Sequence, residues 1–77
     1  MAALKDVLKA QIAANDPPEV QLNLTRLQDA GIPEEEAWRW LSAALLQEMA
    51  LVVNRYRPFD REGYVAALNR LPGLRDR

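Results

Sequence analysis

The chain has 77 residues, enough for a single domain in which about 60 % of the unfolded surface becomes buried. It contains no cysteine and no histidine, which excludes disulfides, thiolate metal sites and the commonest general base. The formal net charge is −1, but the charges are unevenly distributed. Most charged residues of the segment 1–38 are acidic, whereas residues 39–77 carry seven arginines.

The arginine-rich half raises a nucleic-acid hypothesis, because clustered positive charge attracts phosphates. We favour the simpler interpretation that these arginines lie at helix ends and on a solvated face. The first nine residues, M-A-A-L-K-D-V-L-K, lack the uninterrupted apolar core of a signal peptide, so we expect a cytoplasmic protein. Polar residues also interrupt the longest apolar run, so we expect no membrane segment.

The first predicted helix covers residues 2–14. Its apolar residues Leu4, Val7, Leu8 and Ile12 follow the i, i+3, i+4 spacing of an amphipathic helix. No strong capping residue precedes it. We therefore expect the first few residues to fray, and the one narrow apolar stripe to pack against the rest of the domain.

The second predicted helix covers residues 17–30. Asp16 is expected to cap its start, with Pro17 at the first helical position and Glu19 completing a capping box. Gly31 is expected to end it in the left-handed conformation, with Ile32 folding back in a Schellman motif. The connection to the next helix is short, which is typical of antiparallel or steeply angled neighbours.

The third predicted helix, residues 33–57, is the longest. Pro33 suits its first position, three glutamates follow in its first turn, and Arg55 and Arg57 in its last turn complement the helix dipole. Pro58 is expected to end it. The 3.6-residue period predicts one main buried face, formed by Trp38, Leu41, Leu45, Met49, Val52 and Tyr56.

The fourth predicted helix covers residues 61–71, with Asp60 as its cap. Phe59 and Tyr64 are placed as a hydrophobic staple at its start. The apolar residues Tyr64, Val65, Leu68 and Leu71 are expected to be buried. The sequence therefore predicts one all-α domain over residues 1–77, in which three shorter helices pack around a long central one.

The long helix has more apolar surface than the main face. Trp40, Ala44 and Leu51 form a second line along it, and Leu46 and Val53 form a third. Three short helices offer too little apolar surface to cover all of these side chains. We therefore expect a homodimer formed through this helix, with a two-fold axis that brings the same patch of both copies together. The alternative is that the first helix folds over this side and buries Trp40 within the monomer.

The chemistry of the sequence favours a protein without catalytic activity. No histidine or cysteine is present to activate Ser42, Thr25 or a tyrosine, and we expect no cofactor and no metal. A helix-turn-helix reading fails, because the start of the long helix carries glutamates that phosphate would repel. The alternative function is binding of nucleic acid or another anionic partner through Arg55, Arg57, Arg61 and Arg70. We favour a protein partner over this, and nothing in the sequence identifies one beyond a second copy.

Four motifs resemble a group of small, uncharacterised bacterial helical proteins. They are N-D-P-P-E-V (15–20), R-L (26–27), G-I-P-E-E-E-A (31–37) and R-P-F-D-R-E-G-Y-V-A-A-L-N-R-L-P (57–72). These are turn, cap and core positions, so the resemblance implies a helical fold and no known activity. Members of the group often carry histidines near the first and the long helix. This chain has none, so no metal role carries over.

Overall fold

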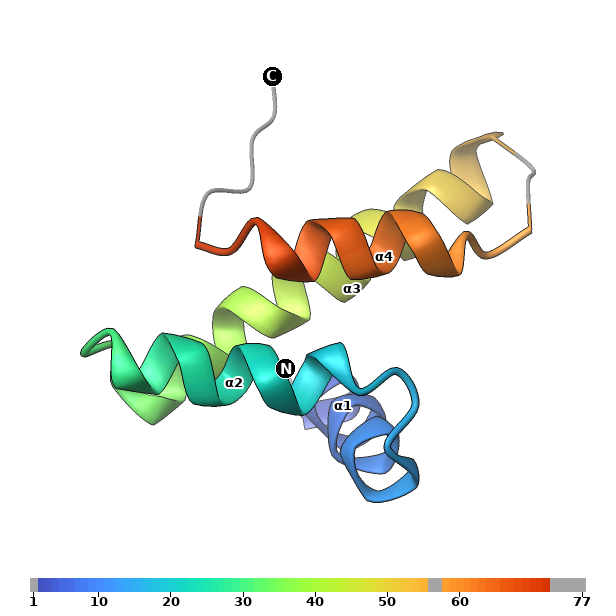
Figure 1. Cartoon of the computed structure of the whole chain (residues 1–77). Helices are drawn as coiled ribbons and strands as arrows, with labels where there is room; N and C mark the ends of the chain where they lie inside the picture. Colours follow the sequence, from blue (N-terminus) through green and yellow to red (C-terminus); the bar gives the residue numbers. More distant parts are fainter. Residues whose placement is uncertain (1, 56–57, 73–77) are drawn as a thin grey trace.

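A computed structural model of the chain describes residues 2–55 and 58–72, and these form an all-helical domain. The helices are α1 (Ala2–Ala14), α2 (Glu19–Asp29), α3 (Glu34–Arg55) and α4 (Arg61–Asn69). The long helix α3 contacts each of the other three, and Figure 1 shows α2 and α4 lying across one side of it. The predicted architecture, a long helix packed by three shorter ones, is confirmed.

The core lies where α2 and α4 meet α3. The largest fully buried side chains come from all four helices and from the residue that follows α4: Tyr64, Leu8, Leu27, Leu41, Leu68, Leu71 and Val20. From α1, Leu8 is fully buried, and Leu4 and Ile12 pack against the core. Val7 was expected on the same stripe but is exposed, because α1 presents only its Leu4, Leu8 and Ile12 line to the domain.

The start of α2 differs from the expected capping box. The helix begins at Glu19, Pro18 occupies the N-cap position, and no side chain caps it. Pro17 and Pro18 have no backbone N–H, so few donors are left at the start of α2 for the Asp16 carboxylate to accept from. Asp16 instead forms an ion pair with Arg61 of α4.

The end of α2 has the predicted Schellman motif. Gly31 has a φ of 95°, which favours glycine, and its N–H donates to the carbonyl of Gln28 at 3.0 Å. The N–H of Ile32 donates to the carbonyl of Leu27, also at 3.0 Å. Ile32 then packs against the core, so the turn directs the chain into α3.

The long helix α3 begins one residue later than expected. Pro33 precedes it, and the carbonyl of Pro33 accepts a hydrogen bond of 2.9 Å from the N–H of Ala37. Glu34 in the first turn accepts a 3.2 Å hydrogen bond from the indole N–H of Trp38. The last described residue of α3 is Arg55, and the expected final residues Tyr56 and Arg57 lie outside the described part of the chain.

The buried face of α3 is rotated from the predicted one. Trp38, Leu41 and Leu45 are buried as expected, but Met49 is exposed and Val52 only half-buried. The other buried positions are Ala37, Ala44 and Glu48. The side of α3 that carries Glu48 faces inward because the chain returns along it as α4. Tyr56, which was also expected to be buried, lies outside the described residues.

At the start of α4, Asp60 occupies the N-cap position with an extended backbone, but its side chain makes no capping hydrogen bond. The rings of Phe59 and Tyr64 meet edge to face, with centroids 5.5 Å apart and planes at 72°, as the staple predicted. Phe59 is nevertheless 47 % exposed. The helix ends at Asn69, two residues before the expected end, and Leu71 is buried beyond it.

Candidate interaction surface

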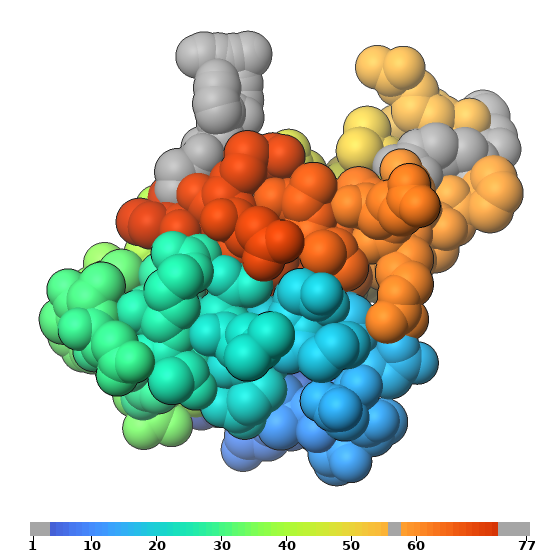
Figure 2. Space-filling model, in the orientation of Figure 1, coloured from blue at the N-terminus to red at the C-terminus, as the bar shows by residue number. Residues whose placement is uncertain are grey.

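The side of α3 that faces away from the core carries an apolar line, exposed except at the half-buried Ala43, which we call the outer face: Ala43, Leu46, Ala50 and Val53. These residues are spaced alternately three and four apart, so they stack along one side of the helix. Leu46 is 51 % exposed and Val53 is 68 % exposed. Figures 1 and 2 show that the last turns of α3, drawn in yellow, stand clear of the other helices. The outer face is therefore open to a partner.

Two residues of the predicted interface belong to this face, and three do not. Leu46 and Val53 are exposed as predicted, with Met49 exposed at the edge. Ala44 is completely buried in the core and offers no surface, so including it was wrong. It lies on the opposite side of α3 from Leu46, and α3 is apolar around most of its circumference, so periodicity alone did not separate the two sides.

The remaining two predicted interface residues are half-buried within the monomer. Trp40 packs against the core cluster, which agrees in part with the alternative that the monomer covers it. Leu51 lines a hollow of about 220 Å³ between α3 and α4. Both flank the outer face on the same side, so neither is its centre.

A groove of about 530 Å³ runs between α1 and the first half of α3 and opens onto the outer face at Ala43 and Leu46. The ammonium of Lys5 lies 5.4 Å from the centroid of a Trp38 ring, in a cation–π arrangement, and 3.9 Å from a carboxylate oxygen of Glu35. These contacts join α1 to the start of α3, so the wall of the groove is held by charge as well as by packing.

Arg39 stands between this groove and a second hollow of about 350 Å³, which is lined by Glu36, Arg39, Trp40 and Ala43. Among the residues that the structure describes, no carboxylate lies within ion-pair distance of its guanidinium. Its charge is thus exposed beside apolar surface, a composition typical of protein interfaces.

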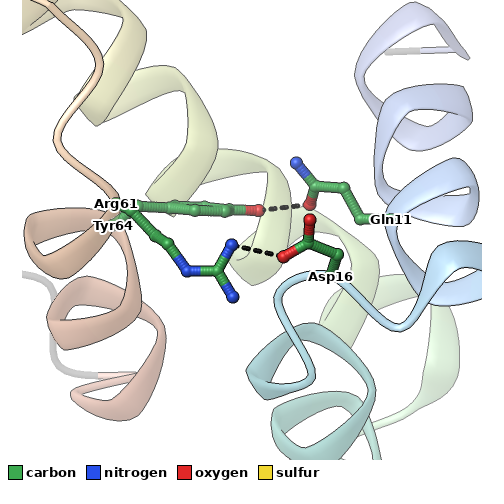
Figure 3. A network of polar contacts seen from close by, with 4 residues as sticks. All are labelled: Gln11, Asp16, Arg61 and Tyr64. Carbon is green, nitrogen blue, oxygen red and sulfur yellow. Dashed lines mark hydrogen bonds and ion pairs between the residues drawn. The ribbon is translucent and has the colours of Figure 1, made fainter.

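Two of the proposed anion-binding arginines lie at opposite ends of α4. Arg61 pairs with Asp16 at the start of α4, as Figure 3 shows, whereas Arg70 follows its other end, about 13 Å away along the helix axis. Arg55 is exposed at the end of α3, and Arg57 lies outside the described residues. The structure therefore does not gather Arg61 and Arg70 into one basic patch.

A second contact beside the Arg61 pair connects α4 to α1. The hydroxyl of Tyr64 donates to Oε1 of Gln11 at 2.7 Å, and Figure 3 shows the two contacts side by side. Burial of the phenol raises the pKa of Tyr64 from 10.0 to about 12, and the Gln11 hydrogen bond moderates the rise. These polar contacts span the gap between two helices that pack mainly on α3.

A buried polar network that the sequence analysis missed joins α2 to α4. Asn23 is buried, and its amide donates to the carbonyl of Glu19 at 2.8 Å and to Oδ1 of Asn69 at 2.9 Å. Arg26 donates to Oδ1 of Asn23 at 2.8 and 2.6 Å and to the carbonyl of Leu68 at 3.3 Å. The sequence signal for this network was the position of Asn23, a polar residue on the apolar face of α2.

A second missed residue is Glu48, whose side chain is 3 % exposed. Its carboxylate accepts a 2.8 Å hydrogen bond from the backbone N–H of Asp60. It lies beside Gly63 of α4, where an added Cβ would be 3.5 Å from Oε1 of Glu48 and 2.8 Å from Oδ2 of Asp60. Sequence reasoning treated Glu48 only as a polar interruption, although it occupies the same side of α3 as Leu41 and Ala44.

Within residues 2–55 and 58–72, no cluster of three or more carboxylates is arranged to hold a metal ion. No helix of this part of the chain has the length and hydrophobicity to cross a bilayer. Comparison with protein-family models, with curated proteins and with solved structures finds no match to the chain. The resemblance to small bacterial helical proteins therefore stays a prediction that rests on its sequence motifs.

Proposed function

We propose that the chain is a non-enzymatic protein-interaction module that self-associates through the outer face of α3. The observation that carries this proposal is the exposure of Leu46 and Val53, 51 % and 68 %, on one line of the longest helix. The residues between them on that line are the alanine Ala50 and, at its edge, the exposed Met49. A second helix can approach such a surface closely.

The gain from covering the outer face is modest. Full burial of one large apolar side chain is worth about 1.5–3 kcal/mol. Leu46, Met49 and Val53 are each roughly half exposed. Six such half-buried side chains from two copies therefore contribute on the order of 5–9 kcal/mol before the entropic cost of association. Since association itself costs at least about 4 kcal/mol, no more than about 5 kcal/mol remains, and we expect a weak dimer that forms towards millimolar concentration.

A second copy suits this face better than a charged partner does. The exposed line from Ala43 to Val53 contains no charged residue, so it offers no charge complement to a nucleic acid or an acidic surface. A two-fold axis would let the same face meet itself, as in most homodimers. Anion binding through Arg55, Arg57, Arg61 and Arg70 is the weaker candidate, because Arg61 is paired with Asp16 and Arg70 lies beyond the other end of α4.

The test is the mass in solution, measured by light scattering or sedimentation from micromolar to millimolar concentration. We expect the native chain to shift towards dimer mass, and Val53→Glu to remain monomeric with unchanged helicity by circular dichroism. Leu22→Glu is the matched control, because Leu22 of α2 is 63 % exposed but lies away from the outer face. It should dimerise like the native chain.

Two results would overturn the proposal. One is a native chain that stays monomeric at millimolar concentration. The other is an equal loss of dimer in Leu22→Glu and Val53→Glu, which would indicate non-specific association of exposed apolar residues. Retention of DNA at low salt that falls steeply as salt rises would instead favour the arginine-rich surface, because phosphate contacts release counterions.

A further inference from the structure

The geometry points to an antiparallel pairing of the two α3 helices over their full length, in which Leu46 packs against Ala43 of the partner subunit. This inference rests on the proposed self-association and specifies its arrangement. It is carried by the order of large, small and charged residues on the outer face and by the opposite charges at the two ends of α3.

The outer face extends towards the start of α3 through Glu36 and Arg39, both exposed. The whole line then splits into two sets whose members are seven residues apart. The first set, which is small apart from its glutamate, is Glu36, Ala43 and Ala50. The second set, which is large, is Arg39, Leu46 and Val53. Such a pattern matches the a and d positions of a two-helix coiled coil.

A parallel pair would bring each residue opposite its own copy. Arg39 would then face Arg39 of the partner subunit, and like charges would repel. Ala43 would face Ala43 of the partner subunit and leave a gap between the helices, while the Leu46 layer holds the axes apart. A parallel arrangement therefore combines repulsion with poor packing.

An antiparallel pair brings a member of one set opposite a member of the other. With the midpoints of the two α3 helices aligned, Leu46 meets the partner's Ala43. The aliphatic stem of Arg39 covers the partner's Ala50, and its guanidinium extends to solvent. Large residues thus meet small ones along the central layers, which allows the two helices to interdigitate.

The charges at the ends of α3 favour the same arrangement. Its first turn carries Glu34, Glu35 and Glu36, and its last described turn carries Arg55. Full antiparallel overlap of 22 residues, about 33 Å, places the acidic first turn of each helix at the same end of the pair as the partner's Arg55, where opposite charges attract. The helix dipoles are then also opposed, which is the favourable orientation.

Disulfide trapping tests this geometry cleanly, because the native chain contains no cysteine. Single-cysteine variants are mixed in pairs, with one member extended by an affinity tag so that mixed dimers are distinguished by mass. We expect Ala43→Cys with Leu46→Cys, and Arg39→Cys with Ala50→Cys, to form mixed disulfides on mild oxidation. Ala50→Cys alone should trap no dimer above the collision background measured with Leu22→Cys.

The opposite results are equally defined. Efficient trapping of Ala50→Cys with itself would overturn the antiparallel arrangement in favour of a parallel one. Preferential trapping of Leu46→Cys with Ala50→Cys would show that the helices are shifted by one heptad, and full overlap would be wrong. A native chain that is dimeric by mass while neither expected pair is trapped rejects this geometry alone, whereas a monomeric native chain rejects the proposed function itself.

Discussion

The carboxylate of Glu48, in the interior of α3, accepts a 2.8 Å hydrogen bond from the backbone N–H of Asp60, the residue that precedes α4. This bond spans the connection between the two helices and determines where α4 starts against α3. Asp60 provides no side-chain cap of its own. A buried carboxylate twelve residues earlier thus satisfies one backbone donor at the start of α4.

We predict that Glu48→Ala lowers the free energy of unfolding by about 2–3 kcal/mol, because it removes a charge-assisted hydrogen bond and leaves a cavity. Glu48→Gln keeps an acceptor oxygen and should lose less. The exposed neighbour Gln47 serves as control, and Gln47→Ala should change stability by less than about 0.5 kcal/mol. Urea unfolding followed by circular dichroism measures all three, and equal effects of Glu48→Ala and Gln47→Ala would contradict the role of the bond.

The second prediction concerns the alkaline limit of stability. The pKa of Tyr64 is 10.0 in the unfolded chain and about 12 in the folded one, because burial disfavours the phenolate. Since the folded pKa is raised, the contribution is fully present below pH 10 and declines as the pH rises towards 12. The total loss is on the order of 2–3 kcal/mol.

Unfolding free energies of the native chain and of Tyr64→Phe, measured across this range, isolate the effect. We expect Tyr64→Phe to be about 1 kcal/mol less stable at neutral pH, since it loses the bond to Gln11, and to lack this part of the alkaline decline. The chain has two tyrosines, so a Tyr56→Phe variant lets ultraviolet absorbance follow Tyr64 alone. Titration of that signal near pH 10 in the folded protein would contradict its burial.

The third prediction concerns the link between α2 and α4. Asn23→Ala should destabilise by about 2–3 kcal/mol, because it removes the acceptor of Arg26 and leaves the buried contact with Asn69 unmade. Gln28→Ala, an exposed change on the same helix, should be nearly neutral. If Asn23→Leu proves as stable as the native chain, the network serves specificity of packing more than stability.

The helix ends that sequence reasoning placed well are those with a local cause. Gly31 supplies a positive φ and Ile32 completes the Schellman motif, and both effects act within six residues. Asp16 was wrongly predicted to cap α2, because its partner, Arg61, lies 45 residues away and no local sequence pattern indicates that pair.

The rotation of the buried face of α3 could not be predicted from the sequence, for a related reason. Apolar residues surround most of its circumference, so periodicity does not determine which side faces the core. Burial of Glu48 depends on the N–H of Asp60, just before α4, and burial of Asn23 depends on Asn69, the last residue of α4. These distant partners explain why Met49 is exposed instead, and why only Leu46 and Val53 of the predicted interface lie on the outer face.

The hydrophobic staple at the start of α4 shows the same limit of sequence-based prediction, at Phe59. Its pairing of Phe59 with Tyr64 was readable from their spacing, but the 47 % exposure of Phe59 was not. A fully buried phenylalanine would cost roughly 2–4 kcal/mol when replaced by alanine. With half of the ring in water, the edge-to-face contact and the remaining burial justify a smaller value, about 1–2 kcal/mol.

The two tryptophans of α3 are separated by one residue yet have different surroundings. Trp38 is buried beneath the ammonium of Lys5, whereas Trp40 is only half-buried beside the exposed side of the helix. The chain has no other indole, so replacing either one by phenylalanine leaves a single fluorophore. Emission from Trp38 follows unfolding of the interior, and emission from Trp40 follows events at the surface. Two single-tryptophan variants thus report separately on folding and on the proposed self-association.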